Sequence, residues 1–213
     1  MKALLINGSQ RPNGNTSIAL RAVSDSLREE NVDTEILQVP KTPVSGCCMC
    51  YRCRTAERGR CAIKDDIANA LIEKIIEADA LVLGSPVYFA GPSGQLKAAL
   101  DRVFFIGAYE GFFAGKPGAA VCAVRRGGAV ATIDALQNYF TICGMPVAPS
   151  TYWPIIHGLE PDEAYQDSEG VQAMQMLGKT LAWMMKCFSA GKSIGVLYPD
   201  VPGGERITTN FIR

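Results

Sequence analysis

The sequence predicts a doubly wound α/β domain, in which helices cover both faces of a parallel sheet. Short uninterrupted apolar runs, typical of strands buried on both faces, alternate about five times with segments of helical spacing. Loops dense in glycine, proline, serine and asparagine follow several of these runs, at the sheet edge where such domains bind ligands. With no internal repeat and no interdomain linker, the pattern indicates one domain built on a parallel sheet.

Composition narrows the class of protein. The chain has 213 residues, of which 48% are apolar and 20% charged, as in globular proteins. Lys and Arg number 21, and so do Asp and Glu, which argues against a globally basic protein that binds nucleic acid or membrane surfaces. No apolar run reaches the ~18 residues of a membrane-spanning helix, and the amino end turns polar too early for a secretory signal. We therefore expect a cytoplasmic protein that binds neither nucleic acid nor membranes.

The first elements alternate as the fold requires. Residues 4–6 form a buried strand, residues 16–30 place their apolar side chains on one helical face, and residues 34–39 form a second strand. Asn15 or Thr16 can cap the first helix.

The remaining elements continue this alternation as far as a final long helix. A helix opens at residues 125–128 and runs to about Cys143. We expect residues 1–189 to form the domain, with a cysteine-rich insert at 45–64, and residues 190–213 to form a tail lying over the body or a partner. The other predicted elements are helix 66–78 capped by Asp65-Asp66, strand 80–83, helix 94–105, strand 118–124, a short strand at 146–148 and helix 168–188.

The loop after the first strand has the chemistry of a phosphate site. It leads into a helix N-terminus, whose free N–H groups and partial positive charge attract anions. Gly8 and Gly14 allow close backbone approach, and the loop matches neither GxxxxGK[ST] nor GxGxxG, which favours a terminal phosphomonoester. The alternative is a plain turn with an N-cap. The side chains expected to hold the phosphate are Ser9, Arg11, Asn13, Asn15, Thr16 and Ser17.

Several motifs together resemble one known family. Gly8-Ser9-Gln10-Arg11 with Asn15-Thr16-Ser17 resembles the phosphate loop of the flavodoxin-like NAD(P)H-dependent FMN reductases, and residues 84–89 resemble their second flavin loop. The cysteine spacing, with Asp65-Asp66, Arg125-Arg126-Gly127-Gly128, Gly144-Met145-Pro146-Val147 and Tyr152-Trp153, resembles the iron–sulfur flavoprotein branch. The resemblance runs from residue 1 to about residue 185. It implies a flavodoxin-like five-stranded sheet, bound FMN, NAD(P)H as a transient electron donor, and a homodimer or homotetramer with the cofactor near the interface.

The second and third loops suit a flat ring. Two prolines stiffen residues 85–92, which carry adjacent aromatic side chains, and a flavin needs flat apolar contact together with backbone groups along its polar edge. The resemblance places Pro86, Val87, Tyr88 and Phe89 against the ring; the alternative is that the two aromatic residues belong to the core. Arg125, with Gly127 and Gly128, follows the fourth strand and could reach the flavin or an incoming nicotinamide phosphate, the alternative being a solvated surface.

The insert carries the spacing of an iron–sulfur site. Cys47, Cys50, Cys53 and Cys61 are separated by two, two and seven residues, as ferredoxin-type ligands can be, and arginines flank them. A [4Fe–4S] cluster is favoured, while zinc and a metal-free, thiol or disulfide state stay open. Cys48 is expected to point away. The scattered Cys122, Cys143 and Cys187 are expected to be buried.

Other polar residues suggest no second chemistry. His157 has no acid or nucleophile beside it, and Asp101-Arg102, at the end of a helix, suggests an ion pair. A dimer face is expected from the aromatic residues Phe104, Phe105, Phe112, Phe113, Tyr152 and Trp153. The leading hypothesis is an FMN-dependent oxidoreductase that moves electrons between a reduced donor and a small-molecule or protein acceptor, through FMN and the cluster. A non-enzymatic electron carrier and a metal or redox sensor are the alternatives.

Overall fold

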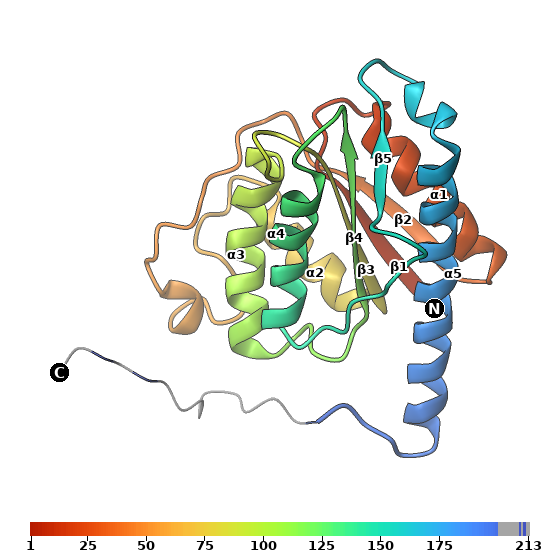
Figure 1. Ribbon diagram of the computed structural model, residues 1–213. Coiled ribbons are helices and arrows are strands. Elements are labelled where there is room, and N and C mark those ends of the chain that lie inside the picture. Colours follow the sequence, from red (N-terminus) through yellow and green to blue (C-terminus); the bar gives the residue numbers. More distant parts are fainter. Residues whose placement is uncertain (200–208, 210, 212–213) are drawn as a thin grey trace.

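A five-stranded parallel sheet forms the centre of the protein, as the computed structural model shows for residues 1–199, 209 and 211 (Figure 1). The strand order β2-β1-β3-β4-β5 is that of flavodoxin-like domains, which confirms the predicted fold class. The strands are β1 (Lys2–Asn7), β2 (Asp33–Gln38), β3 (Ala80–Pro86), β4 (Gly118–Val124) and β5 (Ile155–His157).

Apolar runs form the inner strands because those strands are covered on both faces. In β1, Ala3 through Ile6 are inaccessible to solvent, and Leu5 stands opposite Ile36 of β2 and Val82 of β3. The edge strand β2 is half-exposed and carries both polar and apolar side chains. Because the strands are parallel, the polar loops that follow β1, β3 and β4 lie at the same edge of the sheet.

Helices cover both faces of the sheet (Figure 1). One face carries α1 (Asn15–Glu29) and α5 (Ser168–Ser193); the other carries α2 (Ala68–Glu77), α3 (Gly94–Glu110) and α4 (Ala129–Ile142). Two short 3₁₀-helices, η1 (Arg52–Arg54) and η2 (Glu163–Gln166), lie in the connecting loops.

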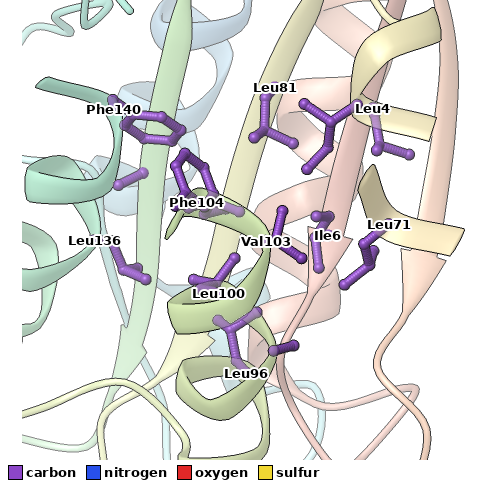
Figure 2. Close-up of a cluster of buried hydrophobic side chains, with 14 of the residues drawn as sticks. Leu4, Ile6, Leu71, Leu81, Leu96, Leu100, Val103, Phe104, Leu136 and Phe140 are labelled. Carbon is purple, nitrogen blue, oxygen red and sulfur yellow. The ribbon is translucent and has the colours of Figure 1, made fainter. Parts of the chain in front are cut away.

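The apolar core on the α3 face of the sheet holds helix α3 in place. Figure 2 shows apolar side chains of α3 facing those of β1 and β3, with α2 and α4 closing the sides. The labelled side chains are Leu4, Ile6, Leu71, Leu81, Leu96, Leu100, Val103, Phe104, Leu136 and Phe140.

The fifth strand differs from the prediction. It lies at Ile155–His157 and pairs with the carboxyl end of β4, whereas Val147 makes a single bridge to Gly118. Pro146 begins the predicted segment and Pro149 follows it; both lack the N–H that a ladder needs, which limits pairing there.

Two helices, α3 and α5, also run further than predicted. α3 extends to Glu110 rather than 105, and α5 continues to Ser193, past the expected start of the tail. Beyond α5, Tyr198 packs against Gly115 and Gly144, and most of the predicted 190–213 tail after residue 199 lies outside the described residues. None of the described helices has the length and apolar character needed to cross a bilayer.

Candidate functional site

The loop after β1 is folded by its own polar side chains. The side-chain oxygen of Asn7 accepts a hydrogen bond from the Ser9 N–H (3.0 Å), and Ser9 Oγ accepts one from the Arg11 N–H (3.1 Å). The Gln38 amide donates to the carbonyls of Asn7 (3.3 Å) and Ser9. Nε2 of Gln10 is buried without a partner among the described residues. The loop is therefore preformed.

The N-terminus of α1 has no side-chain cap. Gly14 is the N-cap residue, so the predicted capping by Asn15 or Thr16 is wrong. The Asn15 side chain turns away, with Nδ2 donating to the carbonyl of Glu160 (3.0 Å) and Oδ1 accepting from the N–H of Ala164 (3.3 Å). The N–H groups of Asn15 and Thr16 have no partner within the helix. This end of α1 is therefore suited to an anion, and no N-cap side chain closes it.

The loop after β3 ends in a strained two-residue turn. Tyr88 and Gly91 exchange backbone hydrogen bonds of 2.9 and 3.0 Å, and Phe89 (φ 49°) and Ala90 (φ 58°) between them are left-handed. Tyr88 is half-exposed and Phe89 fully exposed, so the core alternative for these aromatic residues is wrong. A Cβ at Gly128 would lie 2.9 Å from Ala90 Cα, which means that the start of α4 packs beneath the turn.

Buried serine hydroxyls hold the first two loops together. Ser93 Oγ donates to the carbonyl of Gly8 (2.6 Å), and the Ser93 N–H donates to Ser85 Oγ (2.9 Å). The Gly8 N–H in turn donates to the Gly84 carbonyl (2.8 Å). A Cβ at Gly8 would lie 2.6 Å from a methyl group of Leu96, so the glycine permits this close approach.

These loops enclose a cleft of about 230 Å³ at the carboxyl edge of the sheet, which we call the strand-end cleft. Of the predicted cofactor-binding residues, Ser9, Arg11, Asn15, Thr16, Pro86, Val87, Tyr88 and Arg125 line it. The others lie outside its lining: Asn13, whose Oδ1 accepts from Arg21 (3.0 Å), the buried Ser17, the exposed Phe89, and Gly127 and Gly128 at the start of α4.

One wall of the cleft was missing from the sequence prediction. Gly158, Leu159 and Pro161 line it from the loop that follows β5. The run of turn-forming residues after Ile155-Ile156 is the signal that could have shown this loop, once the strand was placed there.

His157, at the end of β5, has a structural role. Its N–H (2.7 Å) and Nδ1 (3.1 Å) contact one carboxylate oxygen of Asp167, whose other oxygen accepts from the Gly170 N–H (2.9 Å) and caps α5. Burial opposes ionisation of Asp167, but the hydrogen bonds from Gly170 and His157 outweigh it and lower its pKa.

The predicted metal ligands lie together in the cysteine loop, residues 45–64. Cys47, Cys50, Cys53 and Cys61 line one small cavity of about 20 Å³, and Cys48 lines it too instead of pointing away. Burial raises the pKa of Cys53, and the thiols of Cys61, Cys50 and Cys47 raise it further. The N–H of Arg52 and, after it, the Cys48 thiol lower the pKa of Cys50. These effects show that the thiol groups converge.

Four thiols around one cavity are a donor set that suits an iron–sulfur core, in which each thiolate binds a different iron. Within the described part of the chain, no three His, Cys, Asp or Glu side chains are arranged to hold one metal ion. Residues 43–51 have no regular secondary structure, so no helix or strand hydrogen bonds fix this segment, and Met49 (φ 53°) and Tyr51 (φ 56°) within it are left-handed.

A buried arginine forms the floor of the cysteine loop. Arg102 of α3 is 1% exposed and pairs with the buried carboxylate of Asp66 instead of with its neighbour Asp101, which pairs with Lys97 (2.8 Å). Its Nε donates to Cys61 Sγ at 3.2 Å. Burial opposes ionisation of Asp66, but hydrogen bonds from Arg102 and from the N–H groups of Ala68 and Ser45 outweigh it and lower its pKa. Asp66 also accepts a hydrogen bond from the Ala68 N–H (3.1 Å) at the start of α2, but the N-cap residue is Ile67, so the predicted cap at Asp65-Asp66 is wrong.

Aromatic rings and ion pairs surround the cysteine loop. The Arg54 guanidinium lies 4.4 Å from the ring centres of both Phe105 and Tyr109. At the surface, Arg58 pairs with Glu110 (3.1 Å), while Arg52 and Arg60 pair with Glu57 (3.0 Å) and Glu73 (2.6 Å). These contacts attach the loop to α3 and α2.

Among the scattered cysteines and the predicted aromatic residues, some side chains are buried and others are exposed. Cys122 and Cys143 are buried as predicted, and burial raises the pKa of Cys122 to about 12, but Cys187 on α5 is exposed. Phe104 and Phe113 belong to the core and cannot form a dimer face, whereas Phe112, Tyr152 and Trp153 are exposed.

The strand order, the uncapped helix end and the strand-end cleft together define a flavodoxin-like protein whose cleft lies beside a helix end suited to an anion. Residues 1–160 match the family described as NADPH-dependent FMN reductase. The chain belongs to this family, which makes it a redox flavoprotein.

Curated relatives support the family, and solved structures support the fold. An iron–sulfur flavoprotein from Methanocaldococcus jannaschii is 36% identical over 195 residues, covering 87% of this chain and 98% of that protein. A crystal structure of RosB with bound 8-demethyl-8-formylriboflavin-5′-phosphate has a TM-score of 0.67 at 16% identity, covering 100% of this chain and 96% of the other. A flavodoxin from the domain Archaea has a TM-score of 0.57 at 18% identity, covering 87% of this chain and 99% of the other.

Proposed function

We propose that the protein is an FMN-dependent oxidoreductase that takes electrons from NAD(P)H and delivers them to a small-molecule or protein acceptor. The observation that carries this proposal is the uncapped N-terminus of α1 at one end of the strand-end cleft. A phosphomonoester is the ligand that such an end attracts, and the cleft beside it has room and flat walls for a ring. Membership of the FMN reductase family supports the choice of FMN.

Different residues of the strand-end cleft would contact different parts of FMN. The N–H groups of Asn15 and Thr16, with the side chains of Ser9 and Arg11, would hold the phosphate. When bound, the flavin supplies hydride and electron transfer chemistry. Arg125 would supply positive charge at the mouth of the cleft.

The opposite wall would contact the ring. Pro86, Val87 and Tyr88 form this wall, and the Ser93 hydrogen bonds hold it at a fixed distance from the phosphate loop. The exposed Phe89 at the tip of the turn would cover the ring from outside rather than lie beneath it.

The cysteine loop would hold a [4Fe–4S] cluster through Cys47, Cys50, Cys53 and Cys61. Four thiolates give the ligand set a net negative charge, which Arg102 and the surface arginines of the loop offset. The cavity of about 20 Å³ has room for about one water molecule, so the exposed segment that carries Cys47 and Cys50 would move outward on cluster binding.

Protein purified without oxygen tests this function. We expect flavin absorption bands with about one FMN per chain, a broad iron–sulfur shoulder with matching iron and acid-labile sulfide, and steady oxidation of NADH or NADPH. A colourless protein that takes up no added FMN would refute the proposal. Flavin and iron without measurable NAD(P)H oxidation would instead identify a non-enzymatic electron carrier.

We also propose that the protein is a homodimer or homotetramer. The adjacent exposed rings of Tyr152 and Trp153, whose centres are 4.9 Å apart, support an interface, because neighbouring exposed apolar groups mark such surfaces. Light scattering coupled to gel filtration tests this, and a monomer at micromolar concentration would contradict it.

A further inference from the structure

Arg102 lies where the proposed cluster would meet the body of the protein. It projects from α3, is 1% exposed, and lines the cavity formed by the cysteines. An arginine so deeply buried needs a partner for its charge, which Asp66 supplies with a side chain that is 4% exposed. Ion pairing with Asp66 uses Nη1, so the Nε–H remains available to Cys61.

Every donor nitrogen of Arg102 is directed to the loop. Besides the Nε contact with Cys61 Sγ (3.2 Å), Nη1 donates to the Ser45 carbonyl (3.1 Å) and Nη2 to the Ile63 carbonyl (2.8 Å). The guanidinium thus joins both ends of the cysteine loop to α3. The fork geometry cannot be reproduced by lysine, which presents one nitrogen.

We propose that Arg102 is a positioning residue for the proposed cluster: it holds Cys61 as a ligand and raises the reduction potential of the cluster through its N–H···S hydrogen bond. The proposal rests on the cluster assigned under the proposed function. Hydrogen bonds to ligand sulfurs, burial and net charge are the means by which proteins set cluster potentials. One-electron reduction adds one negative charge and breaks no ligand bond, so a buried N–H donor stabilises the reduced state more than the oxidised state.

The hydrogen bond can be separated from the charge with two substitutions. Arg102→Lys keeps a cation opposite Asp66 and removes the donor to Cys61. Arg60→Gln removes one charge next to Cys61 in sequence, from a side chain that is 59% exposed and pairs with Glu73 at the surface. The first variant tests the donor and the second is its matched control for net charge.

The measurement is the midpoint potential of the reconstituted cluster, from anaerobic dithionite titration followed by electron paramagnetic resonance. We expect Arg102→Lys to lower the equilibrium constant for reduction by about tenfold, which is about 59 mV for a one-electron couple, while Arg60→Gln changes it by less than about twofold. An unchanged potential in Arg102→Lys, or equal shifts in both variants, would overturn the proposal.

Folding is controlled separately. The double variant Arg102→Gln/Asp66→Asn removes both buried charges together, and the FMN content and melting temperature of each variant report on the fold. A variant that keeps FMN and its melting temperature but takes up less iron and sulfide supports the positioning of Cys61. If the unaltered protein binds FMN and no cluster, both the cluster and this inference fail; if it binds the cluster and the variants match its potential and iron content, this inference alone fails.

Discussion

Replacing Arg11 by glutamine removes one positive charge from the strand-end cleft while keeping a side chain of similar length. The structure places Arg11 on the same wall as the uncapped end of α1, so its guanidinium can contact a phosphate bound there. A hydrogen bond to a charged group contributes about 1.5–3 kcal/mol, and the exposure of Arg11 puts the expected loss at the lower limit. About 1.4 kcal/mol corresponds to a tenfold weaker Kd.

The assay compares two ligands that differ in the phosphate. FMN and riboflavin share the ring, so titrations followed by flavin fluorescence should show about tenfold weaker FMN binding and less than about twofold change for riboflavin. Arg28→Gln is the matched control, because Arg28 lies on the same helix about 20 Å from Asn15, well beyond the screening length of about 8 Å at physiological salt. Equal weakening of both flavins, or none, would show that Arg11 does not contact the phosphate.

Three further substitutions test the surroundings of the two sites. Gly158→Ala places a Cβ 2.6 Å from Nδ2 of Asn15 and should weaken FMN binding by about tenfold in the same titration; unchanged binding would show that Asn15 can shift without disturbing the cleft. Lys116→Met removes three hydrogen bonds from a half-buried ammonium to the last carbonyls of α2, and should lower the free energy of unfolding by about 2–3 kcal/mol in urea titrations; a loss below about 0.5 kcal/mol would contradict this. Asp66 has a lowered pKa, so its contribution to stability is complete above the ordinary pKa of aspartate, about 3.9, and is lost as the pH falls through the folded value. The Asp66→Asn variant should therefore be less stable than the unaltered protein near neutral pH, and the difference should shrink below about pH 4. A difference that stays constant with pH would refute the lowered pKa of Asp66.

The strands buried on both faces could be predicted from the sequence, because their surroundings require continuous apolar runs. β1, β3 and β4 are such strands. β5 is only Ile155–His157, too short for a clear pattern, and the competing segment at 146–148 is apolar but contains Pro146 and is followed by Pro149. Pairing with β4 decides between the two segments, and that pairing is a tertiary contact. The misplacement of β5 also hid the loop at 158–161, and with it one wall of the strand-end cleft.

Long-range polar contacts could not be read from the sequence. An arginine on an amphipathic helix normally lies at the surface, and the partner that allows Arg102 to be buried, Asp66, is 36 positions away. Asn15 is similarly engaged by Glu160, which is 145 positions away, so its sequence position suggested a cap while its side chain holds a distant loop. The clustering of cysteines was visible in sequence because their spacing is local.

Helix α3 contacts both candidate sites and fixes the distance between them. Its first residue, Gly94, follows the serine that fixes the flavin loops, and Arg102 further along supports the cysteines; at 1.5 Å per residue the two points are about 12 Å apart along the axis. Because the helix packs against the sheet along its length, it acts as a spacer of constant length between the two sites. Under the proposed function it would set the separation of flavin and cluster, and a proline in its middle, which costs a helix about 3 kcal/mol or more, would change that separation.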